Sequence, residues 1–115
     1  MRTTGRLGIP VLALLGVVSM AVAAPGKGSP ETGKKLYLES CRHCHGARGD
    51  GKGEMGAYLT PAPSDLTSGK TQAKSDAELR KVIMEGRAGT AMTGFGTYND
   101  EQVAALLAYI RSLKP

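Results

Sequence analysis

The sequence has little of the material that usually fills a hydrophobic core. Its 115 residues include no Trp, one Phe and four Tyr, whereas Gly occurs 16 times. All five aromatic side chains lie within residues 25–115, and a domain of about 91 residues with so few large side chains would be only marginally stable by itself. We therefore expect a bound group to complete the core. Burying a few hundred Å² of a flat organic cofactor, at roughly 25 cal/mol per Å², would contribute on the order of 10 kcal/mol.

Cysteine, histidine and clustered positive charge are also scarce, which limits the classes of site. The chain has two Cys and two His, all between positions 41 and 45. A structural zinc site needs four ligands in a tetrahedron, and one helical turn can hardly wrap four ligands around a metal. A thioredoxin-like redox pair would need a strand–turn–helix context that these residues lack. No Lys/Arg cluster of the kind that binds nucleic acid is present.

What the chain does contain is the segment Cys41-Arg42-His43-Cys44-His45. Two cysteines three residues apart, with a histidine directly after the second, are typical of the attachment site of a c-type haem. On one helical turn Cys41, Cys44 and His45 can face the same flat partner. The motif predicts that Cys41 and Cys44 form thioethers with one covalent haem c and that His45 is an axial iron ligand. We expect His43 to lie at the surface.

The first 24 residues are predicted to be a cleaved signal peptide. Arg2 and Arg6 precede an almost uncharged apolar run, which ends in the small residues Ala21-Val22-Ala23-Ala24. An uncleaved membrane anchor is the alternative, since about eighteen apolar residues can just span a bilayer. We expect residues 25–30 to form a flexible tail and residues 31–115 to form the folded domain. Export to the periplasm would suit thioether formation, which takes place in an oxidising compartment.

Charge gives an expectation about partners. The full chain carries a formal net charge of +5, and removal of Arg2 and Arg6 would leave +3. This mildly basic balance favours transient encounters with redox proteins and gives no reason to expect nucleic acid or, after cleavage, a membrane as partner. A monomer is expected. The cations that could guide such encounters are Lys52, Lys70, Lys74, Lys81 and Arg87.

Helical patterns and caps predict an all-α fold of three to four helices, with long loops wrapped around one covalent haem. The first helix is expected to begin near Glu31 and to run into the haem motif. Ser75-Asp76-Ala77-Glu78 is a capping box that opens a helix ending at Gly86. The segment from Asn99 to Gln102 repeats this logic before apolar residues recur at helical spacing up to Leu113. No strand-like alternation occurs.

In this order the elements resemble the class I monohaem cytochromes c, from Gly33 to Leu113. The resemblance implies that Gly33 and Tyr37 on the first helix cross Leu106 and Tyr109 on the last. It also places a ligand methionine in the loop before the last helix, at Met92. One departure is Thr93, because the family usually has proline directly after that methionine.

Three methionines of the predicted domain are candidates for the second axial ligand. Met84 lies at helical spacing with an apolar face and is expected to pack in the core. Met55 follows His45 by ten residues, on the expected proximal side. Met92 lies in a Gly-flanked loop and is our expected ligand, an open or water-filled site being the alternative. A backbone carbonyl near Pro61–Pro63, or at Leu59 or Thr60, is expected to orient His45.

A histidine–methionine pair would fill both axial positions and favour a positive reduction potential. The prediction is therefore an electron-transfer protein rather than an enzyme: a one-electron carrier between respiratory redox partners. Two alternatives remain open. The same fold would serve as a fixed subunit of a larger oxidoreductase, or as a haem enzyme or gas sensor whose methionine leaves the iron.

Overall fold

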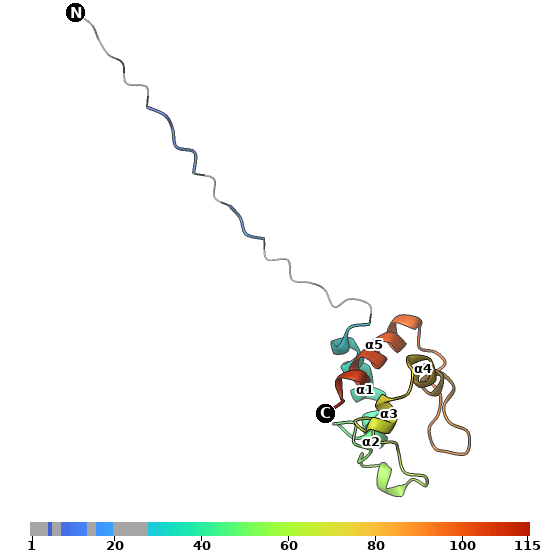
Figure 1. Cartoon of the computed structure of the whole chain (residues 1–115). Helices are drawn as coiled ribbons and strands as arrows, with labels where there is room; N and C mark the ends of the chain where they lie inside the picture. Colours follow the sequence, from blue (N-terminus) through green and yellow to red (C-terminus); the bar gives the residue numbers. More distant parts are fainter. Residues whose placement is uncertain (1–4, 6–7, 14–15, 20–27) are drawn as a thin grey trace, which may run out of the picture.

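A computed structural model of the chain describes residues 5, 8–13, 16–19 and 28–115 (Figure 1). Within these residues all regular structure is helical, apart from one isolated antiparallel bridge between Gly86 and Thr93. The helices are α1 (Pro30–Ser40), α2 (Arg42–His45), the 3₁₀ turn η1 (Gly56–Tyr58), α3 (Gly69–Gln72), α4 (Asp76–Glu85) and α5 (Asp100–Ser112). The predicted all-α fold is confirmed. Three of these helices have ten or more residues, and α2 and α3 are single turns.

Helices α4 and α5 begin at their predicted caps, and α1 begins one residue before the predicted start near Glu31. Ser29 caps α1, with Pro30 in its first turn, so the folded domain starts slightly before Glu31. Ser75 and Glu78 form the predicted capping box of α4, and Gly86, with φ of 76°, ends that helix. Asn99 and Gln102 form the same reciprocal box at the start of α5. In each box two backbone N–H groups that would otherwise lack partners receive a side-chain acceptor.

Helices α1 and α5 cross at Gly33, where the two backbones come into direct contact. A Cβ atom at position 33 would lie 2.9 Å from the Tyr109 Cβ and still closer to the Ala105 carbonyl. One turn further along α1, the Tyr37 ring packs against the Tyr109 ring with centroids 5.1 Å apart. The predicted crossing is confirmed, with Ala105 as an additional contact. Only glycine allows so close an approach.

A small hydrophobic core lies where α1, α4 and α5 meet (Figure 1). Its buried members are Tyr37, Leu79, Ile83, Val103, Leu106 and Ile110. Met84 packs against this cluster, as predicted from its helical spacing. Two long connections, residues 46–68 and 86–99, leave the core and return to it, and with α2 and α4 they enclose the site described below.

Hydrogen bonds from side chains tie the short helix α3 to α5. The Gln72 side-chain amide donates to the Leu66 carbonyl and to the Ile110 carbonyl. Arg111 on α5 donates to the carbonyls of Gln72 and Lys74 and pairs with Asp76 at 2.8 Å. These contacts fix the connection between the middle of the chain and α4.

The predicted signal peptide falls largely outside the described residues, and the basic start and the cleavage site at Ala23 or Ala24 lie wholly outside them. In the described parts of its apolar run, residues 8–13 and 16–19 form no helix or strand. Ile9, Val11 and Val17 are each more than four-fifths exposed and contribute nothing to the core. Among the described residues, no helix is long and apolar enough to cross a bilayer.

Candidate haem site

The turn from Cys41 to His45 presents its cysteines and final histidine to one cavity. Cys41 ends α1 through an N–H bond to the Tyr37 carbonyl, and the N–H groups of Cys44 and His45 then donate to the Cys41 carbonyl at 3.3 and 2.9 Å. This tight turn places Cys41, Cys44 and His45 together on the cavity wall. The predicted side-by-side arrangement of the three residues is therefore what the structure has.

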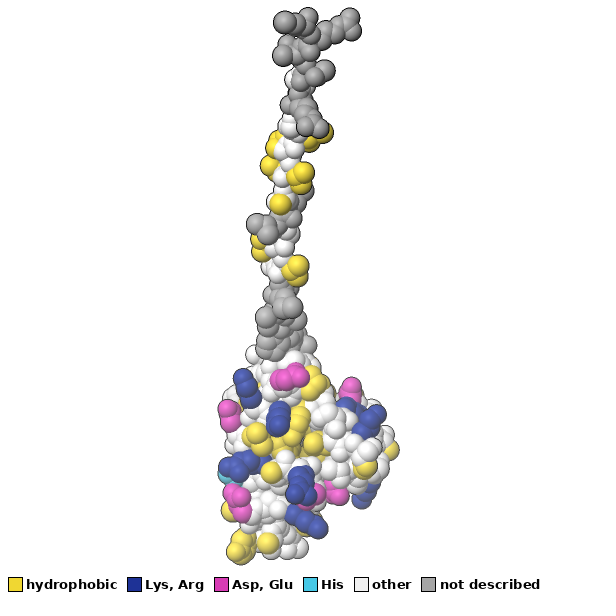
Figure 2. All heavy atoms as spheres, turned by 90° about the vertical axis from the view of Figure 1, so that its left-hand side faces the viewer, with side chains coloured by type: hydrophobic (Ala, Val, Ile, Leu, Met, Phe, Trp, Pro, Cys, Tyr) yellow, Lys and Arg dark blue, Asp and Glu magenta, His cyan; other side chains and the backbone are white. Residues whose placement is uncertain are grey.

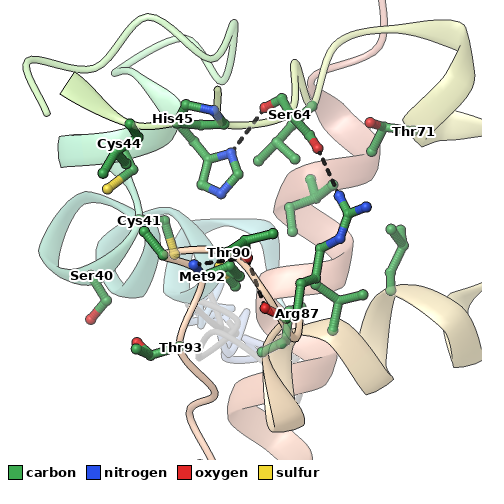
Figure 3. A pocket seen from close by; sticks show the side chains of 18 of the residues that line it. Ser40, Cys41, Cys44, His45, Ser64, Thr71, Arg87, Thr90, Met92 and Thr93 are labelled. Atoms are coloured by element: carbon green, nitrogen blue, oxygen red, sulfur yellow. Dashed lines mark hydrogen bonds between the residues drawn. The ribbon is translucent and has the colours of Figure 1, made fainter. Parts of the chain in front are cut away.

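The cavity has a volume of about 250 Å³ and lies between the haem motif, α4 and the two long connections (Figure 3). Its walls are mainly apolar, as organic cofactors require. Besides the motif residues, the lining includes Leu59, Pro61, Ala62, Pro63, Leu66, Leu79, Val82, Ile83, Ala91, Met92, Phe95 and Ile110. A flat hydrophobic group attached to Cys41 and Cys44 would meet these side chains.

The His45 ring is held by one hydrogen bond from its Nδ1 atom to the Ser64 carbonyl, at 2.9 Å. A carbonyl can only accept, so Nδ1 carries the proton and Nε2 keeps a free lone pair. Figure 3 shows the ring between Ser64 and the cavity, with its second nitrogen directed into the cavity. This is the arrangement that a metal-binding histidine needs.

The orienting carbonyl is one residue beyond the segment named in the sequence analysis, where Pro61–Pro63, Leu59 or Thr60 was expected. The structural reason is an anchor further on. The Leu66 N–H donates to the Gly49 carbonyl at 2.6 Å, and Gly51 packs against Pro63 so closely that a Cβ there would lie 2.7 Å from the Pro63 carbonyl oxygen. These contacts hold residues 63–66 against the loop that follows His45, so that the Ser64 carbonyl points toward the His45 ring.

Burial affects the ionisation of the groups behind the motif. It raises the pKa of the Cys41 thiol to about 11, with a smaller contribution from Cys44. It also raises the pKa of Tyr37, with smaller contributions from Cys41, Tyr109 and Asp50. Both groups are therefore neutral at pH 7, which agrees with an apolar inner wall.

His43 lies at the surface as expected. Its Nδ1 atom is 2.6 Å from Glu54 Oε1, and this hydrogen bond lowers the pKa of the Glu54 carboxyl.

The cavity distinguishes the three candidate methionines. Met92 lines it, whereas Met55 is 49% exposed and Met84 packs beside the core, and neither of these two lines it. In Figure 3 Met92 lies across the cavity from His45, on the loop between α4 and α5. The structure therefore brings Met92 to the same cavity as Cys41, Cys44 and His45.

Two of the five predicted guiding cations lie at this cavity. Lys74 and Arg87 are among its lining residues, and Arg87 donates to the Ser64 hydroxyl at 3.4 Å. Lys52, Lys70 and Lys81 do not line it. On the molecular face shown in Figure 2, Lys and Arg side chains are scattered among acidic and apolar ones and do not form one block.

Two thiols and an imidazole on the wall of an apolar cavity, within a small helical fold, define the class as a c-type haem protein. Comparison with known families agrees, since residues 30–114 match the model described as cytochrome c. The chain belongs to the cytochrome c family, and this region is an electron-transfer domain of that type. Its cofactor is one covalently bound haem c, for which Cys41 and Cys44 are the two cysteines present.

Relatives include both small cytochromes and parts of larger proteins. Cytochrome c55X of Stutzerimonas stutzeri is 34% identical over 102 residues, which cover 89% of this chain and 82% of that protein. Dihydro-heme d1 dehydrogenase of Pseudomonas aeruginosa is 34% identical over 95% of this chain and 19% of its own length. The Cbb3-type cytochrome c oxidase subunit FixP of Bradyrhizobium diazoefficiens is 32% identical over 70% of this chain. The chain spans about a fifth and a quarter of these two larger relatives, respectively.

Similar solved structures also include a small cytochrome and a larger enzyme. The KustC0563 c-type cytochrome superposes with a TM-score of 0.61 and 29% identity, covering 72% of this chain and 98% of that one. The dihydro-heme d1 dehydrogenase NirN, in complex with DHE, gives a TM-score of 0.58 with 34% identity over 73% of this chain and 16% of that one. The fold therefore occurs both as a separate cytochrome and as one domain of an oxidoreductase.

Proposed function

We propose that this protein is a one-electron carrier whose haem is attached through Cys41 and Cys44, with His45 and Met92 as the axial iron ligands. The main support for the proposal is that these four residues line one apolar cavity. Cys41 lies at the end of α1, Cys44 and His45 lie on α2, and Met92 lies on the loop before α5. When bound, the haem supplies an iron that alternates between its ferrous and ferric states.

His45 and Met92 would each contribute to the properties of the iron. His45 is prepared to donate from Nε2, because the Ser64 carbonyl already engages Nδ1. The soft thioether of Met92 favours the ferrous state, and the apolar wall disfavours the additional ferric charge. With His45 and Met92 both bound, the iron would have no open position for a substrate. A closed site of this kind favours electron transfer over catalysis.

Redox proteins are the proposed partners, through small and transient contacts. Lys74 and Arg87 place positive charge at the cavity rim, where it would attract an acidic partner surface. We further propose that residues 1–24 are a signal peptide that directs the chain to the periplasm as a monomer. The exposure of Ile9, Val11 and Val17 supports the signal peptide, because these apolar side chains are not part of the core of the folded domain.

A fixed electron-transfer module of a larger oxidoreductase is the second candidate. It is favoured by relatives in which this fold is a small part of the chain, such as the dehydrogenase and the oxidase subunit. The coverage of cytochrome c55X, 82% of its length, favours the separate carrier.

Two measurements on the haem-loaded protein test the proposal. The oxidised protein should show the sulfur–iron charge-transfer absorption band, and the reduced protein should bind no carbon monoxide at neutral pH. Ready carbon monoxide binding without that band would favour a haem enzyme or gas sensor. For the choice between carrier and module, the native protein should elute from gel filtration as a monomer after release without detergent. Constant co-elution with one oxidoreductase would favour the module.

A further inference from the structure

The loop that carries Met92 lacks the proline that usually follows the ligand methionine in this family, because Thr93 occupies that position. Without such a restraint, a loop rich in glycine and small residues would leave the methionine free to move away from the iron. Residues 87–92 nevertheless form a closed turn held by hydrogen bonds.

The Thr90 hydroxyl is at the centre of this turn. Its Oγ1 donates to the Arg87 carbonyl at 2.8 Å and accepts the Met92 N–H at 3.2 Å. A hydroxyl has one proton to donate and lone pairs to accept, and Thr90 uses both capacities. The backbone adds two more links: the Arg87 N–H donates to the Met92 carbonyl at 3.0 Å, and the Thr90 N–H donates to the Arg87 carbonyl at 3.2 Å. Figure 3 shows the two bonds of the hydroxyl beside the cavity.

The base of the turn is itself anchored to α4. The Gly86 N–H donates to the Val82 carbonyl at the end of that helix, and Gly86 forms the isolated bridge with Thr93. Beyond the loop, the Phe95 N–H donates to the Ile83 carbonyl at 2.8 Å. The Arg87 carbonyl is therefore a fixed point, and the Thr90 hydroxyl connects Met92 to it.

We propose that Thr90 is a positioning residue for the axial methionine, replacing by two hydrogen bonds the stiffness that proline would give. The inference rests on the proposed function, in which Met92 binds the iron. Thr90 also lines the cavity, but the inference assigns to it no bond to the iron and no step in electron transfer. Its effect is on how readily another ligand displaces Met92.

The test measures the equilibrium affinity of the oxidised, haem-loaded protein for imidazole, which competes with Met92. Thr90→Val keeps the branched shape but removes the hydroxyl, so it should bind imidazole about three to ten times more tightly, as expected for the loss of one or two modest hydrogen bonds. Thr90→Ser keeps the hydroxyl and should stay close to the parent. Thr97→Val is the matched control, because Thr97 is exposed and its hydroxyl has no hydrogen-bond partner in the part of the chain that the structure describes.

The outcomes separate the inference from the proposed function. An imidazole affinity of Thr90→Val equal to that of the parent would overturn the role of Thr90, as would a Thr90→Ser variant that behaves like Thr90→Val. An equal increase in the imidazole affinity of Thr97→Val would also overturn the role of Thr90. If Thr90→Val does not load haem, Thr90→Ala decides by the same criterion. If the parent has no charge-transfer band and binds imidazole as tightly as Met92→Ala, the methionine ligation itself is wrong.

Discussion

The hydroxyl of Tyr37 donates a hydrogen bond of 2.6 Å to the carbonyl of Gly46. Tyr37 is fully buried on α1, and Gly46, with φ of 85°, directly follows His45. The bond therefore joins helix α1 to the residue that directly follows the haem motif. It fixes the position of His45 relative to the α1–α5 pair.

Tyr37→Phe should lower the free energy of unfolding by about 1–3 kcal/mol, because it leaves the buried Gly46 carbonyl without this donor. Denaturant unfolding followed by far-UV circular dichroism measures the loss. Tyr58→Phe is the control, since Tyr58 is 84% exposed, and it should change stability little. Equal effects of the two substitutions would mean that the Tyr37 bond contributes nothing.

A comparison of the parent with Tyr37→Phe across a range of pH tests the ionisation of Tyr37. Burial raises the pKa of Tyr37 in the folded protein, whereas an unfolded tyrosine ionises near pH 10. The unfolded chain therefore releases this proton first, and the parent should lose stability as the pH rises above about 10. The stability difference between the parent and Tyr37→Phe should shrink in that range. A difference that stays constant from pH 7 to pH 11 would contradict the raised pKa.

Gly33→Ala should destabilise the protein by about 2 kcal/mol or more, because its Cβ would overlap the Ala105 carbonyl and approach the Tyr109 Cβ to 2.9 Å. Gly69→Ala is the matched control: Gly69 lies in α3 and a Cβ there would meet nothing within 4 Å. This control should be neutral or slightly stabilising, since alanine is the better helix former. Thermal unfolding compares the two variants, and equal midpoints would mean that α1 and α5 do not touch at Gly33.

Removal of the cysteines should remove the covalent haem. Cys41→Ser or Cys44→Ser should retain at most one thioether, and the double variant none, with poor accumulation of the folded protein because the core is small. Denaturing electrophoresis with a haem stain shows attached haem directly. Unchanged staining of the double variant would end the cytochrome interpretation.

The parts of the structure that were predictable from sequence depend on local chemistry. Ser75, Glu78, Asn99 and Gln102 determine where α4 and α5 begin through hydrogen bonds within four residues of chain. The turn from Cys41 to His45 is equally local. Such features need no knowledge of the tertiary fold, which is why their positions agree with the structure.

The parts that were missed depend on segments distant in sequence. Helix α3 has no apolar periodicity, and its Gln72 is held by the Ile110 carbonyl 38 residues away. The choice of Ser64 as the partner of His45 follows from the contact between Leu66 and Gly49. Thr90 gave no signal beyond its place near Met92, since a threonine in a loop is usually an ordinary surface residue. The sequence feature that distinguishes Thr90 is a hydroxyl two residues before a predicted ligand methionine that lacks its following proline.

Met92 is proposed to be the second axial iron ligand, with His45 as the first. Met92→Ala should keep both thioethers but lose the sulfur–iron charge-transfer band of the oxidised protein. Its reduction potential should fall, because water or hydroxide stabilises ferric iron better than a thioether does, and the reduced variant should bind carbon monoxide stoichiometrically.

Met84→Ala is the control for that experiment, because Met84 packs against the core without lining the cavity. It should cost about 2–4 kcal/mol of stability while keeping the charge-transfer band. The most direct measurement is therefore the oxidised absorption spectrum of the two variants side by side. The account predicts a band in Met84→Ala and none in Met92→Ala, and the opposite pattern would contradict it.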